Sequence, residues 1–289
     1  AGVPKGVLNL VMGRGSVVGQ TMLDSRGVNA ISFTGSVETG AKVAMACSGR
    51  GAKYQLEMGG KNPLVVLDDA NIDAAVAASI DGAFFQTGQR CTASSRLVVQ
   101  SKVHDAFVEK MVTAMKALKV DHALKEGTVV GPVVDENQMA QDEKYIGIAR
   151  DEGGELAWGG ERLNRDTKGH YLSPALFTNT KNEMRINREE VFGPVASVIK
   201  VGSYDEALAV ANDTAFGLSS GIFTTSLKYA TDFRKKSAAG MVMVNLPTAG
   251  VDYHVPFGGR KGSSYGAREQ GRFAADFYTS VKTAYTLAG

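Results

Sequence analysis

The chain has 289 residues, 44% of them hydrophobic, which is enough to bury the cores of two domains and excludes a disordered protein. Its 32 basic and 30 acidic residues give a net charge of +2 and are scattered, so the charge pattern favours neither nucleic acid nor an anionic membrane surface as a partner. We therefore expect a small-molecule ligand.

Short apolar runs alternate with helix-like stretches at the start of the chain. Strands are predicted at Val7–Met12, Ala30–Phe33 and Tyr54–Leu56. Helices are predicted between them, at Val17–Asp24 and Val37–Cys47. This β-α-β-α-β order is typical of half of a doubly wound sheet.

The second turn of this unit is a candidate anion site. Gly35 and Ser36 come directly before a predicted helix, whose free N–H groups and dipole favour a pyrophosphate, and Gly40 leaves room for close approach. Ser36 is also explained as an N-cap that needs no ligand. The glycines of Gly13–Gly19 are spaced one residue too far apart for the dinucleotide fingerprint.

The rest of the chain continues the α/β alternation. A buried strand is predicted at Pro63–Leu67, and the next helix has apolar residues at every fourth position from Ile72 to Phe84 and ends near Gly88. The stretch Gly258–Gly266 lacks the ending of a phosphate-binding loop, so we predict a flexible loop that closes over the site. Later strands are predicted at Arg96–Gln100, Glu155–Trp158, Tyr171–Leu176, Val195–Val201, Ile222–Thr224 and Met241–Val244, and later helices at Glu136–Glu152, Tyr204–Asn212 and Leu227–Ser237.

Cys91 is the candidate nucleophile, because it follows a glycine-containing turn that would expose its sulfur near free backbone N–H groups. Taken alone, a single cysteine is more often a small buried hydrophobe. The only other cysteine is Cys47, and neither is spaced from the four histidines like a metal ligand, so no metal site is predicted. This cysteine usage fits a reducing cytoplasm.

Glu57 is the candidate general base. It lies inside an apolar, strand-like run that breaks at Gly59 and Gly60. Burial would raise the pKa of this carboxyl toward neutrality, which suits a group that takes a proton from water. A strand-end glutamate hydrogen-bonded to backbone explains the same residue without catalysis.

These stretches belong to a specific series of motifs: Phe33–Ser36, Leu56–Lys61, Gly88–Cys91, Glu190–Pro194, Asn245 and Pro256–Gly259. In this order they resemble the aldehyde dehydrogenase superfamily, and the resemblance runs from Ala1 to Gly289. The family's Leu-Gly-Gly is Met58–Gly60 here, and the chain begins part-way through the family's cofactor domain.

The resemblance implies a mechanism. Cys91 attacks an aldehyde, NAD or NADP accepts the hydride, and Glu57 activates the water that cleaves the resulting thioester. Without the motif, Glu190 would pass for a surface glutamate beside Glu189. The resemblance implies cofactor contacts for Gly35, Ser36, Glu190, Phe192 and Gln138, and places Asn245 and Phe257 along the aldehyde tunnel.

The substrate class follows from a narrower similarity. Gly88–Ser95, Asn245–His254 and Gly262–Gly266 are similar to 2-oxoglutarate semialdehyde (2,5-dioxopentanoate) dehydrogenases. The Arg90 guanidinium could bind a substrate carboxylate, or it could point away into the structure. An aliphatic aldehyde or succinic semialdehyde is the alternative substrate.

Domain organisation is also implied by the resemblance. Residues 1–59 would be the C-terminal part of a Rossmann-like NAD(P)-binding domain, 60–262 an α/β catalytic domain, and 263–289 a return segment. The alternating Ser280–Leu287 would form an oligomerisation strand of a homodimer or homotetramer. No apolar run approaches the ~18 residues of a membrane span.

Two rival readings of function remain at this point. A cysteine hydrolase would need a histidine base, and none of the histidines has a suitable context. The other rival is a non-catalytic fragment, since the family's oxyanion asparagine would lie upstream of Ala1. On that basis we expect these residues alone to bind NAD(P) poorly and to turn over little aldehyde.

Overall fold

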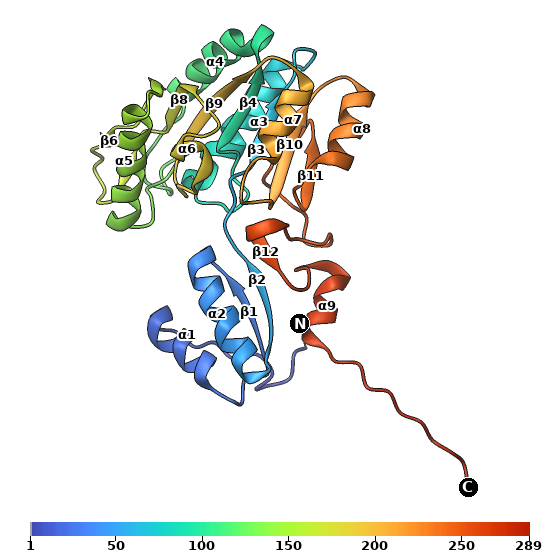
Figure 1. Ribbon diagram of the computed structural model, residues 1–289. Helices are drawn as coiled ribbons and strands as arrows, with labels where there is room; N and C mark the ends of the chain where they lie inside the picture. The colour runs from blue at the N-terminus through green and yellow to red at the C-terminus, as the bar shows by residue number, and fades with distance from the viewer. Residues whose placement is uncertain (1) are drawn as a thin grey trace.

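The computed structural model describes residues 2–289 and consists of a smaller and a larger body (Figure 1). The α-helices are α1 (Gly15–Asp24), α2 (Val37–Arg50), α3 (Ile72–Phe84), α4 (Ser101–Lys116), α5 (Glu136–Asp151), α6 (Arg185–Arg188), α7 (Tyr204–Asn212), α8 (Leu227–Lys236) and α9 (Ala274–Tyr278), and the 3₁₀ helices are η1 (Phe85–Gly88), η2 (Lys261–Ser263) and η3 (Gly271–Phe273). The strands are β1 (Ala30–Thr34), β2 (Lys53–Glu57), β3 (Pro63–Val66), β4 (Arg96–Gln100), β5 (Glu155–Trp158), β6 (Arg162–Leu163), β7 (Tyr171–Leu172), β8 (Ala175–Thr180), β9 (Val195–Val201), β10 (Ser219–Phe223), β11 (Met241–Val244) and β12 (Ser264–Tyr265).

The larger body is built on a seven-stranded sheet with the order β11-β10-β3-β4-β9-β8-β5, in which β5 alone runs antiparallel among the described residues. Strand β3, in the middle of the sheet, is apolar on both faces. Leu64 and Val66 of β3 pack with α3 and α4, whereas Val65 packs with α7 and α8. Helices therefore cover both faces, which is the arrangement that continuous apolar strands predict. The predicted α/β class is confirmed.

The smaller body contains a three-stranded sheet with the order β1-β2-β12 (Figure 1). Strands β1 and β2 are parallel, as the β-α-β pattern predicts. β12 comes from the far end of the chain and pairs antiparallel with β2, so that Ser264 lies opposite Glu57. The prediction of a flexible loop over Gly258–Gly266 is therefore wrong in part, because η2 and β12 fix the second half of that stretch against β2.

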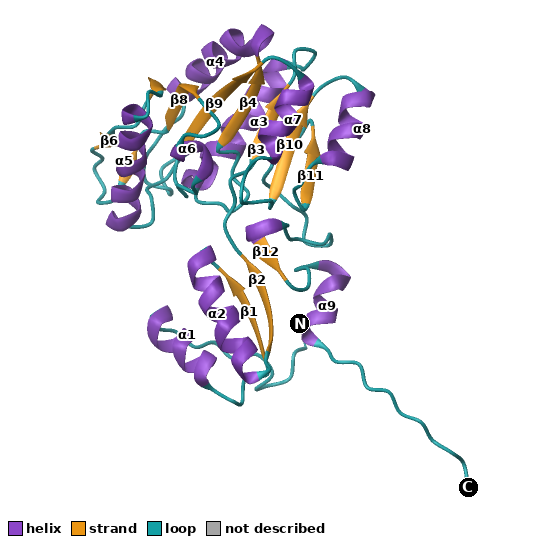
Figure 2. Cartoon of the chain, viewed as in Figure 1, coloured by secondary structure: helices purple, strands orange, loops and turns teal. Residues whose placement is uncertain are grey.

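Two predicted strands are absent from the described residues. Val7–Met12 forms no strand and is exposed, with Leu10 84% accessible. Ser280–Leu287 is an extended tail without strand structure, which Figure 2 draws as loop beyond α9. The physical reason is the same for both, because a strand is stable only beside a neighbour that satisfies its N–H and C=O groups, and the described residues supply none there.

Smaller corrections concern element ends. The predicted strand Tyr171–Leu176 is two strands, β7 and β8, separated at Ser173 and Pro174 because proline has no N–H to continue a ladder. α3 ends at Phe84 rather than near Gly88. The domain boundaries after residues 59 and 262 remain predictions. Within residues 2–289, no helix is long and apolar enough to cross a membrane.

Candidate active site

A cavity of about 850 Å³ lies where the ends of β1 and β2 meet the loop after α3 and the start of α5. Most of the side chains that the sequence nominated lie around it. Met58 and Gly59 follow directly on Glu57 and form part of its wall. The nominated residues that line the cavity are Gly35, Ser36, Arg90, Cys91, Gln138, Glu190 and Phe192.

Cys91 lies in a tight turn after η1. Gln86 and Thr87 have positive φ, and at Gly88 a Cβ would collide with the carbonyl of Gly193. The turn therefore requires glycine where it packs closest, and it leaves the Cys91 side chain half-buried on the cavity wall. This position is consistent with the prediction that the turn exposes the sulfur of Cys91.

The environment of the Cys91 thiol opposes ionisation. Burial raises its pKa, and the nearby Glu190 and Glu57 carboxylates raise it further. The backbone N–H groups of Cys91 and Thr92 lower the pKa in part. Burial and the two carboxylates therefore favour the protonated thiol, whereas the two N–H groups favour negative charge on or beside the sulfur.

Glu57 is 4% exposed at the end of β2. Burial raises its pKa to about 7, and the hydrogen bond that Ser264 Oγ donates to Glu57 Oε2 at 2.6 Å opposes the rise. A carboxyl with this pKa is half ionised near neutral pH, which suits a general base. Sequence reasoning nominated Glu57 and missed Ser264, because 207 residues separate them.

Glu190 and Phe192 enter the cavity from the connection before β9. Glu190 Oε1 accepts a hydrogen bond from the Gly60 N–H at 3.0 Å, and burial raises the pKa of this carboxyl. At Gly59 a Cβ would overlap the same carboxylate, so a larger residue there would force the Glu190 side chain to move. Phe192 has φ +60° and its side chain is 40% exposed. Together they offer a hydrogen-bond acceptor and an aromatic ring to a ligand.

The first turn of α2 closes the opposite wall. Gly35 and Ser36 line the cavity, and Ser36 Oγ accepts a hydrogen bond from the Thr39 N–H at 3.3 Å. Ser36 is thus the N-cap of a fourteen-residue helix, whose start favours a negatively charged group. Gln138 also lines the cavity, but its Nε2 donates to Asp142 and to the Val191 carbonyl.

The three residues predicted to bind the substrate are placed less favourably for that role. Arg90 lines the cavity, yet its Nη2 donates to the carbonyl and the carboxylate of Asp81. Asn245 bonds both polar atoms of its amide to the backbone of Thr224 and does not line the cavity. Phe257 pairs with Glu269 through backbone hydrogen bonds and is likewise outside the lining residues.

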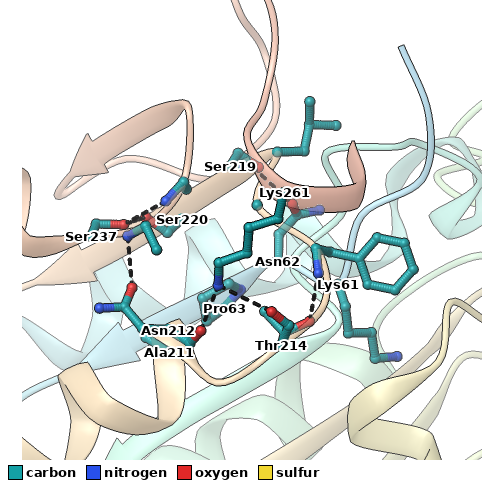
Figure 3. A pocket seen from close by; sticks show the side chains of 15 residues that line it. Lys61, Asn62, Pro63, Ala211, Asn212, Thr214, Ser219, Ser220, Ser237 and Lys261 are labelled. Carbon is teal, nitrogen blue, oxygen red and sulfur yellow. Dashed lines mark hydrogen bonds between the residues drawn. The ribbon is translucent and has the colours of Figure 1, made fainter. Parts of the chain in front are cut away.

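A second, much smaller cavity lies behind the site between the starts of β3 and β10 (Figure 3). Its volume is about 10 Å³, enough for about one water molecule. Lys261 Nζ donates to the carbonyls of Asn212 and Thr214 beside it. Lys61 is 1% exposed, and burial lowers its pKa to about 7. In residues 2–289 no cluster of His, Cys, Asp and Glu could hold a metal ion.

Comparison with known proteins gives a family match and several similar proteins. The sequence model described as "Aldehyde dehydrogenase family" matches residues 1–284. The chain is 48% identical over 287 residues to an alpha-ketoglutaric semialdehyde dehydrogenase of Bacillus subtilis, covering 99% of this chain and 59% of that protein. It is 43% identical over 292 residues to an alpha-ketoglutarate semialdehyde dehydrogenase of Haloferax volcanii, with the same two coverages.

A solved structure shares the fold. The crystal structure of a betaine aldehyde dehydrogenase from Staphylococcus aureus in complex with NAD⁺ superposes with a TM-score of 0.91 at 35% identity, covering 96% of this chain and 55% of that one. The chain thus spans between half and three-fifths of the length of the proteins it matches.

Proposed function

The chain belongs to the aldehyde dehydrogenase family, and from this premise we propose that it carries the nucleophile, the general base and part of the cofactor site for oxidising an aldehyde to a carboxylic acid with NAD or NADP. One observation supports this most strongly. A half-buried cysteine and a helix N-terminus line one cavity of about 850 Å³, and a buried carboxyl with a pKa of about 7, Glu57, lies directly before two of its lining residues, Met58 and Gly59.

The cavity fits the nicotinamide end of a dinucleotide. The start of α2 at Gly35 and Ser36 offers N–H groups to a pyrophosphate, and Glu190 keeps Oε2 free of protein hydrogen bonds within the described residues, so it can accept a ribose hydroxyl. The exposed ring of Phe192 offers a flat apolar surface to the nicotinamide. The bound cofactor would supply the hydride acceptor. These residues are proposed to hold and orient it.

Acylation falls to Cys91. Its sulfur attacks the aldehyde carbon, the thiol proton passes to water, and the carbonyl π electrons move to oxygen to give a tetrahedral adduct on the protein. The N–H groups of Cys91 and Thr92 lie beside the sulfur and can stabilise the oxyanion. Loss of hydride from this adduct re-forms the carbonyl as a thioester on Cys91.

Deacylation falls to Glu57. Its carboxylate accepts a proton from water, the resulting hydroxide adds to the thioester carbon, and the C–S bond breaks to release the acid and the Cys91 thiolate. The pKa of about 7 means that roughly half of the chains hold the carboxylate at neutral pH. Ser264 holds the ionised oxygen, so it favours the reactive form.

For the substrate we propose a semialdehyde that carries a carboxylate, such as 2-oxoglutarate semialdehyde. Two relatives whose names state this substrate support the choice. Arg90 is the cation on the cavity wall beside Cys91, although its bond to Asp81 holds one of its nitrogens. Succinic semialdehyde and aliphatic aldehydes are the alternatives, and a panel of aldehydes ranked by kcat/KM decides between them.

The test of the function is single-turnover chemistry. A protein containing this chain is mixed with aldehyde and NAD or NADP, and both reduced cofactor and the intact mass are followed. We expect one equivalent of reduced cofactor and an acyl adduct on Cys91. Cofactor reduction that persists in Cys91→Ala would contradict the assignment.

The remaining attributes are proposed with the function. We propose a homodimer or homotetramer in the cytoplasm, with Ser280–Leu287 as the exposed segment available for pairing. Light scattering with and without this segment tests the assembly. We also propose that the 289 residues alone turn over little aldehyde, and NAD(P)-dependent turnover by a sample of intact mass 30.5 kDa would contradict that.

A further inference from the structure

One buried side chain, Asn62, connects the nucleophile turn to the large sheet. It lies just before β3 and is 2% exposed. Its Nδ2 donates to the carbonyl of Cys91 at 2.8 Å and to that of Ala93 at 3.0 Å. Its Oδ1 accepts the N–H of Ser219, at the start of β10, at 3.0 Å. Both amide N–H groups and the amide oxygen of Asn62 make hydrogen bonds, so these partners fix the orientation of the amide.

The bond to Cys91 O determines where the next N–H points. The carbonyl of Cys91 and the N–H of Thr92 belong to one peptide unit, and no cis peptide occurs in residues 2–289. In a trans unit the two groups point in opposite directions. Because Asn62 holds the carbonyl on the β3 side, the Thr92 N–H is directed to the other side, and this N–H lowers the pKa of the Cys91 thiol.

The neighbouring peptide is held as well. Thr248, which is fully buried, donates its hydroxyl to the carbonyl of Thr92 at 2.7 Å and contacts Ser94 Oγ at 2.6 Å. At Gly60 a Cβ would collide with the Cys91 carbonyl, so the backbone before Asn62 approaches this group directly. The turn therefore has little freedom to rotate its peptide units.

We propose that Asn62 is a positioning residue for Cys91, because it holds the Cys91–Thr92 peptide in the orientation whose N–H stabilises negative charge on the sulfur and on the adduct formed there. The part that concerns the adduct rests on the proposed dehydrogenase function. The part that concerns the thiolate does not, since it depends only on the geometry of the turn.

The test is the pH dependence of Cys91 alkylation by iodoacetamide in the 289-residue chain, followed by peptide mass so that the fully buried Cys47 is scored separately. Asn62→Asp retains the acceptor for Ser219 and loses both donors. We expect the midpoint of its alkylation profile to rise by about one pH unit or more, with a roughly tenfold lower rate at about pH 7.5 and an unchanged plateau at high pH.

A matched control is Asn212→Asp. Asn212 lies beside the same small cavity as Asn62 (Figure 3). Its amide also bridges two backbone groups, donating to Lys236 O at 3.0 Å and accepting from Ala238 N at 2.7 Å. Neither partner belongs to the nucleophile turn. Asn212→Asp should lower the melting temperature while its alkylation profile matches that of the unchanged chain.

Asn62→Ser covers the case in which the aspartate variant does not fold, since its hydroxyl can donate to one of the two carbonyls, and we expect an intermediate rise in midpoint. An Asn62 variant that melts cooperatively and has the profile of Asn212→Asp would overturn the proposal. The role of Asn62 and the dehydrogenase function can be refuted independently of each other, because alkylation of Cys91 does not require turnover of an aldehyde. A raised midpoint in the 289-residue chain, together with no aldehyde oxidation by a longer protein that contains it, would support the role of Asn62 and defeat the dehydrogenase function.

Discussion

Glu57→Gln should stabilise the protein, and only at neutral to alkaline pH. The fold raises the pKa of Glu57 from 4.5 to about 7 because the carboxyl is buried. A raised carboxyl pKa means that the folded state holds a proton the unfolded chain has lost, so the stability present below pH 4.5 is lost as the pH rises to about 7. At about 1.4 kcal/mol per pH unit, the full loss is roughly 3 kcal/mol.

Glutamine has nearly the same shape and never ionises, so the substitution removes this loss. Its carbonyl oxygen can still accept the hydrogen bond from Ser264. We expect Glu57→Gln to exceed the unchanged chain in free energy of unfolding by roughly 3 kcal/mol at about pH 8.5 and by less than about 1 kcal/mol at about pH 5. Most substitutions in a protein core lower the free energy of unfolding. An increase that appears only as the pH rises therefore indicates that the substitution has removed a carboxyl with a raised pKa.

Urea unfolding of the two chains at about pH 5 and about pH 8.5, monitored by far-UV circular dichroism, measures this difference. Glu109→Gln is the control, because Glu109 lies on the exposed face of α4, and it should change stability equally at both pH values. If the advantage of Glu57→Gln is the same at both pH values, the carboxyl does not have a raised pKa and the argument for it as a base at neutral pH fails.

Four further predictions concern single substitutions. In a full-length version that contains this chain, Cys91→Ala should abolish aldehyde oxidation and leave cofactor binding nearly intact, as judged by turnover and by titration with NAD or NADP. Glu57→Gln should still give a burst of reduced cofactor and then stall as an acyl-enzyme visible by mass, whereas loss of the burst would move Glu57 to an earlier step. Arg90→Ala should raise KM for carboxylate-bearing semialdehydes about tenfold and hardly affect simple aldehydes, and equal losses on both would mean that its bond to Asp81 is structural. Asp142→Asn should also stabilise the chain above neutral pH, because burial raises the pKa of Asp142 to about 7, and urea unfolding at two pH values without a pH-dependent gain would show that the carboxylate has a stabilising partner.

The sequence by itself determined the layers of the fold. Apolar side chains at every position of β3 and most of β4 require cover on both faces, and the helical periodicity between them supplies it. It also nominated the two candidate catalytic groups, since a cysteine after a glycine-containing turn and a glutamate at the end of a strand-like run are visible locally. These features depend on neighbours within a few residues, which is why a pattern can reveal them.

Only the tertiary structure decided which partners the site residues have. Ser264 reaches Glu57 across 207 residues, and Asn62 holds the Cys91 carbonyl from a different element. Likewise, Asn245 turns its amide to Thr224 instead of the cavity. Hydrogen-bond partners are set by where distant segments dock, and local periodicity records only burial.

The same reason explains the two strands that did not form. Val7–Met12 and Ser280–Leu287 have the alternating or apolar character of strands, but propensity creates no ladder without a neighbour. β12, with only two residues, is a strand because β2 presents an edge to it. A strand is therefore a property of a pair of segments, and the sequence of one segment determines only whether it is able to take part.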